Sequence, residues 1–258
     1  MIHYIVISLV ALLASGLTFF SGFGLGTILV PVFAVYFPIE MAIALTAIVH
    51  FLNNTFKFIL VGKHVQKQIV LRFGLPAIIA ALAGAGLLHL LADVPSLGSY
   101  YIGSREFQIS PVKLTIAVLL ILFSVIELSS KLSNITFDKK YLPIGGLLSG
   151  FFGGLSGNQG ALRSAFLNRA GLTKEQFIAS GTAIAIIIDI SRLTVYSADF
   201  IKPGIIIDYS LVACASLSAF AGAIIGNKAL KKITVKTLQT IVGIMLLLFA
   251  LFLGLGMI

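Results

Sequence analysis

The chain is poor in charged residues, and this shortage excludes most classes of soluble protein. Charged side chains make up 10% of its 258 residues, whereas a soluble domain carries about 25%. Hydrophobic residues make up 59%, and the mean hydropathy is +1.09. No soluble fold of this size buries so much apolar surface, and the apolar runs have the length of membrane helices. The sequence therefore predicts an integral membrane protein.

Cysteine and chemical motifs are also scarce. The single cysteine, Cys214, lies in an apolar run, so no disulfide forms within the chain and a packing role is expected. The sequence has no Cys/His cluster, no P-loop and no nucleophile triad spacing, and we expect neither a metal nor another cofactor. The net charge of +9 comes from lysines and arginines between apolar runs. That placement indicates contact with a lipid bilayer rather than with nucleic acid.

Ten apolar segments are present, and two of them are too short to cross a membrane. The segments 27–37 and 160–170 each follow a glycine cluster, and at 1.5 Å per residue each covers less than ~20 Å of a hydrocarbon core of roughly 30 Å. Each therefore resembles one arm of a helical hairpin that enters and leaves on the same side. The segments are 2–20, 27–37, 41–61, 70–92, 112–128, 141–156, 160–170, 175–197, 204–227 and 235–257.

The glycine-broken pattern occurs twice, once in each half of the chain. The first copy runs from Ser15-Gly16 through Ser21–Thr27 to Ala44-Leu45-Thr46-Ala47. The second runs from Ser149-Gly150 through Gly153–Gly160 to Ser180-Gly181-Thr182-Ala183. In membrane transporters, paired interrupted segments at corresponding positions indicate the substrate site.

Basic connections predict how the chain threads the membrane, because lysine and arginine accumulate on the cytoplasmic side. Each half then consists of a re-entrant hairpin and three crossings, and an odd number of crossings inverts the second half. We predict an all-α integral membrane protein of two inverted repeats, 1–130 and 131–258, in one membrane domain, with residues 2, 98 and 258 outside. The connections taken as cytoplasmic are 62–72, 129–140, 163–174 and 228–236, and those taken as external are 93–111 and 197–203.

A second threading stays open, in which segments 2–20 and 141–156 span fully. It gives eight spanning helices and two parallel halves. The loop charges favour the inverted version, because the charge bias is swapped between corresponding loops. The basic connection 62–72 corresponds to the neutral connection 197–203. The neutral connection 93–111 corresponds to the basic connection 228–236.

Polar residues within predicted spans are costly and usually face the bundle interior or a water-filled path. In helix 41–61, Thr46, His50, Asn53 and Lys57 share one face, and Asn54 lies beside them. Each also has a structural alternative: helix–helix hydrogen bonding for the threonines and asparagines, packing for His50, and snorkelling to the cytoplasmic surface for Lys57.

Helix 175–197 carries the corresponding polar residues Thr182, Asp189 and Arg192. Asp189 and Asn53 are 136 positions apart, the same offset that relates Thr182 to Thr46. Asp189 and Arg192 are three residues apart, so mutual neutralisation near the outer interface is an alternative to a functional role.

The hairpin tips place free backbone N–H groups and helix N-termini at membrane depth, which makes them candidate anion sites. Arg163 follows the second tip and can add a full positive charge, with snorkelling as its alternative. Close packing is the alternative role for the glycines. The candidate tip residues are Ser21, Gly22, Gly24, Gly26 and Thr27 in the first half, and Ser156, Gly157, Asn158, Gln159 and Gly160 in the second.

The pattern resembles the sulfite exporter TauE/SafE family. The resemblance is carried by Gly22-Phe23-Gly24-Leu25-Gly26-Thr27-Ile28-Leu29-Val30-Pro31, by Ala44-Leu45-Thr46-Ala47, and by the repeated half at Gly150–Ala183. Leu167 departs from it, standing where the first half has Pro31. The resemblance implies secondary transport, usually outward, of small sulfur-containing anions such as sulfite, sulfonates or sulfoacetate.

These observations lead to one functional hypothesis and three rivals. We expect a multi-pass exporter in the cell membrane, working by alternating access and taking a small inorganic or organic sulfur anion. The N–H groups of the two tips and Arg163 hold the anion, and His50 or Asp189 binds a coupling proton. The residues that line the path are Thr46, Asn53, Asn54, Thr182 and Asp189. The rivals are an uncoupled anion channel, a membrane enzyme or its accessory using His50 and Asp189, and a structural subunit. The oligomeric state is left open, with a homodimer among the options.

Overall fold

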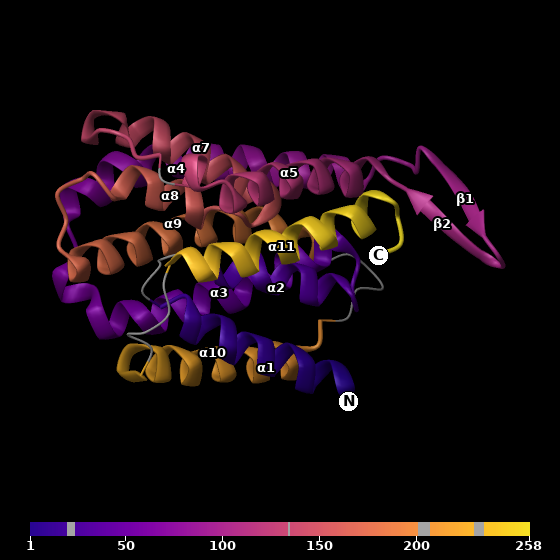
Figure 1. Cartoon of the computed structure of the whole chain (residues 1–258), viewed down its shortest axis with the longest axis horizontal. Helices are drawn as coiled ribbons and strands as arrows, with labels where there is room; N and C mark the ends of the chain where they lie inside the picture. The colour runs from indigo at the N-terminus through magenta and orange to yellow at the C-terminus, as the bar shows by residue number, and fades with distance from the viewer. Residues whose placement is uncertain (20–23, 134, 201–206, 230–234) are drawn as a thin grey trace.

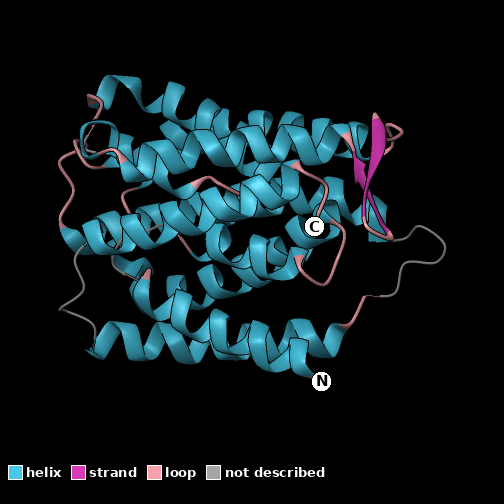
Figure 2. Ribbon diagram, turned by 45° about the vertical axis from the view of Figure 1, so that its right-hand side comes forward, coloured by secondary structure: helices cyan, strands magenta, loops and turns pink. Residues whose placement is uncertain are grey.

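The computed structural model describes residues 1–19, 24–133, 135–200, 207–229 and 235–258. Nearly all of these residues are helical, and the helices lie side by side along the long axis of the molecule (Figures 1 and 2). Five helices are long and apolar enough to cross a membrane. They are α3 (Ile39–Val61), α4 (Lys67–Ala92), α5 (Pro111–Leu128), α9 (Lys174–Phe200) and α10 (Tyr209–Ala229). An all-α membrane protein is thereby confirmed.

Four of the remaining helices are short and form the two predicted pairs. Helical hairpin 1 consists of α1 (Ile2–Leu17) and α2 (Leu25–Ala34), and helical hairpin 2 of α7 (Leu142–Ser156) and α8 (Gly160–Leu167). At 1.5 Å per residue these four helices measure about 24, 15, 22 and 12 Å, less than a hydrocarbon core of about 30 Å. The other helices are α6 (Ser130–Ser133), α11 (Val235–Gly254) and the short 3-10 turns 62–64 and 139–141.

Both helical hairpins return to the end of the bundle at which they start. The ring of His3, the second residue of α1, lies 5.8 Å from that of Tyr36, just beyond α2. In hairpin 2, the Phe137 N–H donates to the Ala165 carbonyl oxygen at 3.1 Å, and the Phe137 ring stacks on Phe166. Neither pair therefore runs from one end of the bundle to the other.

The two hairpins open toward opposite ends. One end carries both chain termini and the two strands (Figure 1), and we call it the strand end. The Tyr4 hydroxyl donates to Asp208 there, which holds the pKa of that carboxyl below its usual range, and the Tyr100 hydroxyl donates to the Leu255 carbonyl oxygen at 2.6 Å. The other end carries the connections 62–66, 129–141 and 168–173, and we call it the basic end.

The strand end contains an element that sequence analysis treated only as a connection. Strands β1 (Gly98–Ile102) and β2 (Arg105–Ile109) pair antiparallel, with Tyr100 opposite Phe107. Gly103 has a φ of +63° in the turn between them, a conformation that favours glycine. Aromatic and β-branched residues on one face explain why this stretch forms a β-hairpin.

Helix packing pairs corresponding elements of the two halves in a reciprocal way. The first helix of each half packs on the fourth of the other, so α1 contacts α10 and α7 contacts α4. The third helices, α3 and α9, contact each other, as do the fifth helices, α5 and α11.

Small residues allow the α4–α7 contact to be close. A Cβ on Gly146, Gly150 or Gly154 would lie only 2.1–2.3 Å from a backbone carbonyl oxygen of α4. In the other half, a Cβ on Gly222 of α10 would lie 2.1 Å from the Leu12 carbonyl oxygen of α1. Helices in a bilayer gain stability from such van der Waals contact, which only glycine permits at this separation.

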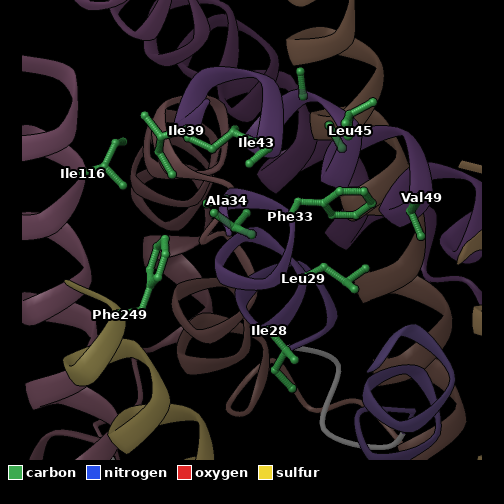
Figure 3. Close-up of a cluster of buried hydrophobic side chains, with 14 of the residues drawn as sticks. Ile28, Leu29, Phe33, Ala34, Ile39, Ile43, Leu45, Val49, Ile116 and Phe249 are labelled. Carbon is green, nitrogen blue, oxygen red and sulfur yellow. The ribbon is translucent and has the colours of Figure 1, made fainter. Parts of the chain in front are cut away.

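Helix α2 is the centre of the larger apolar cluster. Its residues Leu29 and Phe33 are fully buried on the side of Leu45 and Val49 of α3, and Ala34 lies on the side of Ile116 of α5 and Phe249 of α11 (Figure 3). A helix of ten residues cannot hold its position alone. Burial on all sides therefore fixes its N-terminus inside the bundle.

Candidate functional site

The two hairpin tips meet inside the bundle. Gly24, the N-cap of α2, has a φ of +112°, and Gly157, the C-cap of α7, has a φ of +79°, so both turns need glycine. A Cβ on Gly26 would lie 3.4 Å from the Gly157 carbonyl oxygen and 3.6 Å from the His50 ring. Ser21 and Gly22 lie outside the described residues.

A pocket lies beside this contact, and we call it the tip pocket. It collects side chains from both hairpins and from the two helices that follow them. Five of its residues were predicted site residues: His50, Asn53, Asn54, Arg163 and Thr182. Its remaining lining consists of Thr18, Phe19, Leu25, Lys57 and Ile178.

Two cations are buried at the tip pocket. Lys57 is 6% exposed and Arg163 is 3% exposed. The Lys57 ammonium lies 5.5 Å from the centre of the Phe19 ring, and Arg163 Nη1 donates to Gln159 Oε1 at 3.0 Å. Neither side chain extends to the surface, so the snorkelling alternative is wrong for both. No carboxylate is found among the described residues that line this pocket.

Asn53 connects helical hairpin 1 to this lining. The hydrogen-bond network orients its amide so that the nitrogen donates to Ser15 Oγ at 3.0 Å and to the Ala219 carbonyl oxygen at 3.2 Å. The amide oxygen then accepts from Lys57 Nζ at 3.3 Å. Asn53 thus positions the Lys57 ammonium through a hydrogen bond.

Asp189 connects helical hairpin 2 to the bundle interior, as Asn53 connects helical hairpin 1. Its Oδ1 accepts from Gln159 Nε2 at 3.0 Å, from Arg192 Nε at 3.0 Å and from Arg192 Nη2 at 2.8 Å. Its Oδ2 lies 2.6 Å from His50 Nδ1. Asp189 and Arg192 are both fully buried. The two residues do pair, but in the bundle interior rather than at the outer interface.

This network joins the two halves of the chain. His50 comes from α3 and Asp189 from α9, and Gln159 links Asp189 to Arg163. Arg192 Nη1 also donates to the Gly153 carbonyl oxygen at 3.3 Å. A chain of polar contacts therefore runs from α3 to the wall of the tip pocket at Arg163.

Other predicted site residues lie near the tips but do not line the tip pocket. Ser156 Oγ donates to the Phe152 carbonyl oxygen at 3.0 Å, and Asn158 Nδ2 donates to Ser156 Oγ at 3.4 Å. Thr46 is fully buried, and within the described structure its hydroxyl has no hydrogen-bond partner. Thr27 is half-buried in the first turn of α2.

Sequence reasoning left some important contacts undetermined. The sequence did not decide whether Lys57 faces the site or the membrane surface. Its position four residues after Asn53 did indicate that the two side chains lie on the same face of the helix. Phe19, Leu25 and Ile178 are apolar lining residues that no sequence pattern separates from ordinary packing residues.

Comparison with protein families agrees with this arrangement. The family model for sulfite exporter TauE/SafE matches residues 7–253. The chain belongs to the sulfite exporter TauE/SafE family. The resemblance drawn from the glycine motifs is thereby confirmed, and membership in this transporter family implies a membrane transporter of sulfur compounds. The chain matches no curated protein and no solved structure.

Proposed function

We propose that this TauE/SafE family member is a secondary transporter that binds a small sulfur-containing anion, such as sulfite or an organosulfonate, in the tip pocket. The observation that carries the proposal is the burial of Lys57 and Arg163 at one pocket whose described lining includes no carboxylate. Asp189 pairs with Arg192, contacts His50 and also interacts electrostatically with Arg163, so one carboxylate serves several cationic groups beside the tip pocket. Buried charges are costly unless they are paired, and a bound anion supplies the opposite charge.

The dipoles of the short helices α2 and α8 also favour an anion in the tip pocket. Leu25 lines the tip pocket at the first position of α2, and Arg163 lies in the first turn of α8. Helix N-termini carry a partial positive charge and free N–H groups, which favour an anion. The amides of Asn53 and Asn54 and the hydroxyl of Thr182 offer further hydrogen bonds.

We also propose that the two halves are inverted repeats and that the basic end is cytoplasmic. Two observations support this: the hairpins open toward opposite ends, and the helix pairs α1–α10 and α7–α4 are reciprocal. In such transporters one repeat moves against the other around a central site. The tip pocket lies at the contact between the hairpins, where that movement would change access.

Sulfite counterflow into proteoliposomes tests the role of the two cations. Replacing Arg163 by Ala or Lys57 by Met should reduce uptake of radiolabelled sulfite at least tenfold, because a hydrogen bond to a charged group contributes about 1.5–3 kcal/mol. Arg169→Ala and Lys63→Met remove exposed cations at the basic end and serve as matched controls that keep full uptake. Unchanged uptake by a correctly folded Arg163→Ala protein would overturn the assigned site.

An uncoupled anion channel is the second candidate function, because the same pocket would serve it. Liposomes with an imposed pH gradient separate the two. Ohmic sulfite currents that ignore the gradient indicate a channel, whereas a transporter shows saturable counterflow.

A further inference from the structure

A second cavity opens at the basic end, on the other side of α8 from the tip pocket. It holds about 1610 Å³, including its open mouth, and is bounded mainly by α5, α6, α8 and the start of α11. Ala161, Leu162 and Ala165 of α8 line this cavity, whereas Arg163 of the same helix lines the tip pocket. The eight-residue helix α8 is therefore a wall shared by both spaces. We call this second space the basic-end cavity.

The basic-end cavity contains a buried carboxylate that the proposed anion site does not use. Glu127, in the last turn of α5, is 6% exposed and lines the cavity. Its Oε2 has no hydrogen-bond partner within the described part of the chain. An ionised carboxylate in this position would leave one oxygen without compensation, which costs several kcal/mol at membrane depth.

Glu127 is held where it is by direct contact between α5 and α11. One turn earlier, Ser124 Oγ donates to the Gly243 carbonyl oxygen at 2.7 Å. A Cβ on Gly243 would lie 3.4 Å from the Glu127 Cβ, so the two backbones approach closely at this level. The carboxyl group therefore stays on the inner face of α5 rather than rotating out to lipid.

The charged groups around Glu127 are few. Of the described residues that line the basic-end cavity, the charged ones are Glu127 and Lys236, the latter in the first turn of α11. Lys131 of α6 is exposed outside the lining, Arg163 of α8 lines the other pocket, and α9 contributes Phe177. Helices α3, α4 and α7 also pack on α5 and add no residue to the described lining.

We propose that Glu127 is a proton-binding site through which anion transport is coupled to proton movement. Its carboxylate takes a proton from water in the basic-end cavity to form the neutral acid, and it returns that proton when it ionises again. Gln239 of α11, which also lines the basic-end cavity, forms a hydrogen bond with this carboxyl group. This assignment rests on the proposed transport function, and it places the proton away from Asp189, whose oxygens already have Arg192, Gln159 and His50 as partners.

The shared wall supplies the physical link between proton and anion. A displacement of α8 that opens or closes the tip pocket also changes the width of the basic-end cavity around Glu127. Protonation therefore favours one position of helical hairpin 2 over the other. Coupling requires such a two-position element that both ligands influence.

Purified full-length protein in proteoliposomes, with a pH-sensitive dye inside, tests the proposal at alkaline pH, where sulfite itself carries no exchangeable proton. Wild type should show radiolabelled sulfite counterflow and also proton flux driven by a sulfite gradient. Glu127→Gln mimics the protonated acid, so counterflow should stay within about threefold while sulfite-driven proton flux falls at least tenfold. Glu106→Gln, an exposed acid of β2, is the matched control and should change neither signal.

The possible failures point to different parts of the argument. Full proton flux in Glu127→Gln, or counterflow without proton flux in wild type, overturns the proton site. Absence of sulfite counterflow in wild type overturns the proposed function instead.

Gln239→Leu provides a second test if Glu127→Gln does not fold. Removing this hydrogen bond to the carboxylate disfavours ionised Glu127, so the pH at half-maximal proton flux should shift upward by several tenths of a unit. An unchanged pH profile would count against the assignment.

Discussion

At the scale of single residues, buried charge organises this protein. Lys57, Arg163, Asp189 and Arg192 are each at most 6% exposed, in a chain with few charged residues overall. Asp189 and Arg192 form a buried ion pair, whereas Lys57 and Arg163 line the tip pocket and contact the amides of Asn53 and Gln159. The first pair is therefore expected to support the structure, and the second pair to bind an anion.

The difference between the two pairs can be measured as stability. Asp189→Asn leaves the buried Arg192 guanidinium without its anion, so the free energy of unfolding should fall by about 3–5 kcal/mol. Combining it with Arg192→Met should recover most of that loss, because both charges are then removed. Thermal unfolding in detergent measures both effects.

Arg163→Ala serves as the comparison for that measurement. It should lose transport with a smaller shift in the unfolding midpoint, because the buried Asp189–Arg192 ion pair stays intact. Equal destabilisation by Asp189→Asn and Arg163→Ala would show that the two arginines do not have separate roles.

At the scale of elements, two short helical hairpins are held in place by close backbone packing. Gly150 of α7 faces Ala77 of α4, and Gly222 of α10 faces Leu12 of α1. These contacts occupy corresponding positions in the two halves. The hairpin tips depend on them, because α7 and α1 carry the turns that lead to the tip pocket.

Adding one methyl group at these contacts should separate the helices. A Cβ on Gly150 would lie 2.3 Å from the Ala77 carbonyl oxygen, so Gly150→Ala should destabilise by about 1–3 kcal/mol. Gly86→Ala is the control, since no atom lies within 4 Å of the Cβ it adds, and it should be neutral or slightly stabilising. The unfolding midpoints of both variants, compared with that of the unchanged protein, measure the loss of stability. A Gly150→Ala protein of unchanged stability would argue against close α4–α7 packing.

At the scale of the whole molecule, charge separates the two ends of the bundle. Lys63, Lys139, Lys140 and Arg169 belong to the basic end. The strand end carries Asp93, Glu106 and Asp208 as well as Arg105. This distribution of lysine and arginine supports the proposed cytoplasmic orientation of the basic end.

Cysteine labelling from each side of the membrane tests this orientation. The native Cys214 is first replaced by Ser, and single cysteines are then placed at Gly98, Ile258, Lys63 and Lys139. A membrane-impermeant thiol reagent added outside should label the first two positions and leave the last two unlabelled until the membrane is opened. Labelling of Gly98→Cys and Ile258→Cys from opposite sides would contradict the arrangement in which both lie at the strand end.

The sequence by itself determined the class of the protein and the positions of the two helix breaks around which the candidate site is proposed. Low charge and helix-length apolar runs require a bilayer, and the two glycine clusters mark where helices stop inside it, because these are properties of local composition and length. The helix boundaries agree with the predicted segments to within a few residues, while the β-hairpin at 98–109 was missed because its alternating pattern is short.

Only the tertiary structure decided which polar residues meet. His50 and Asp189 are 139 positions apart, and their contact depends on how α3 and α9 are rotated about their axes. The inward orientation of Lys57 depends on its contacts with Phe19 and Asn53. The burial of Glu127 depends on the close approach of α5 and α11. Periodicity gives each helix a polar face, but packing between helices determines what that face contacts.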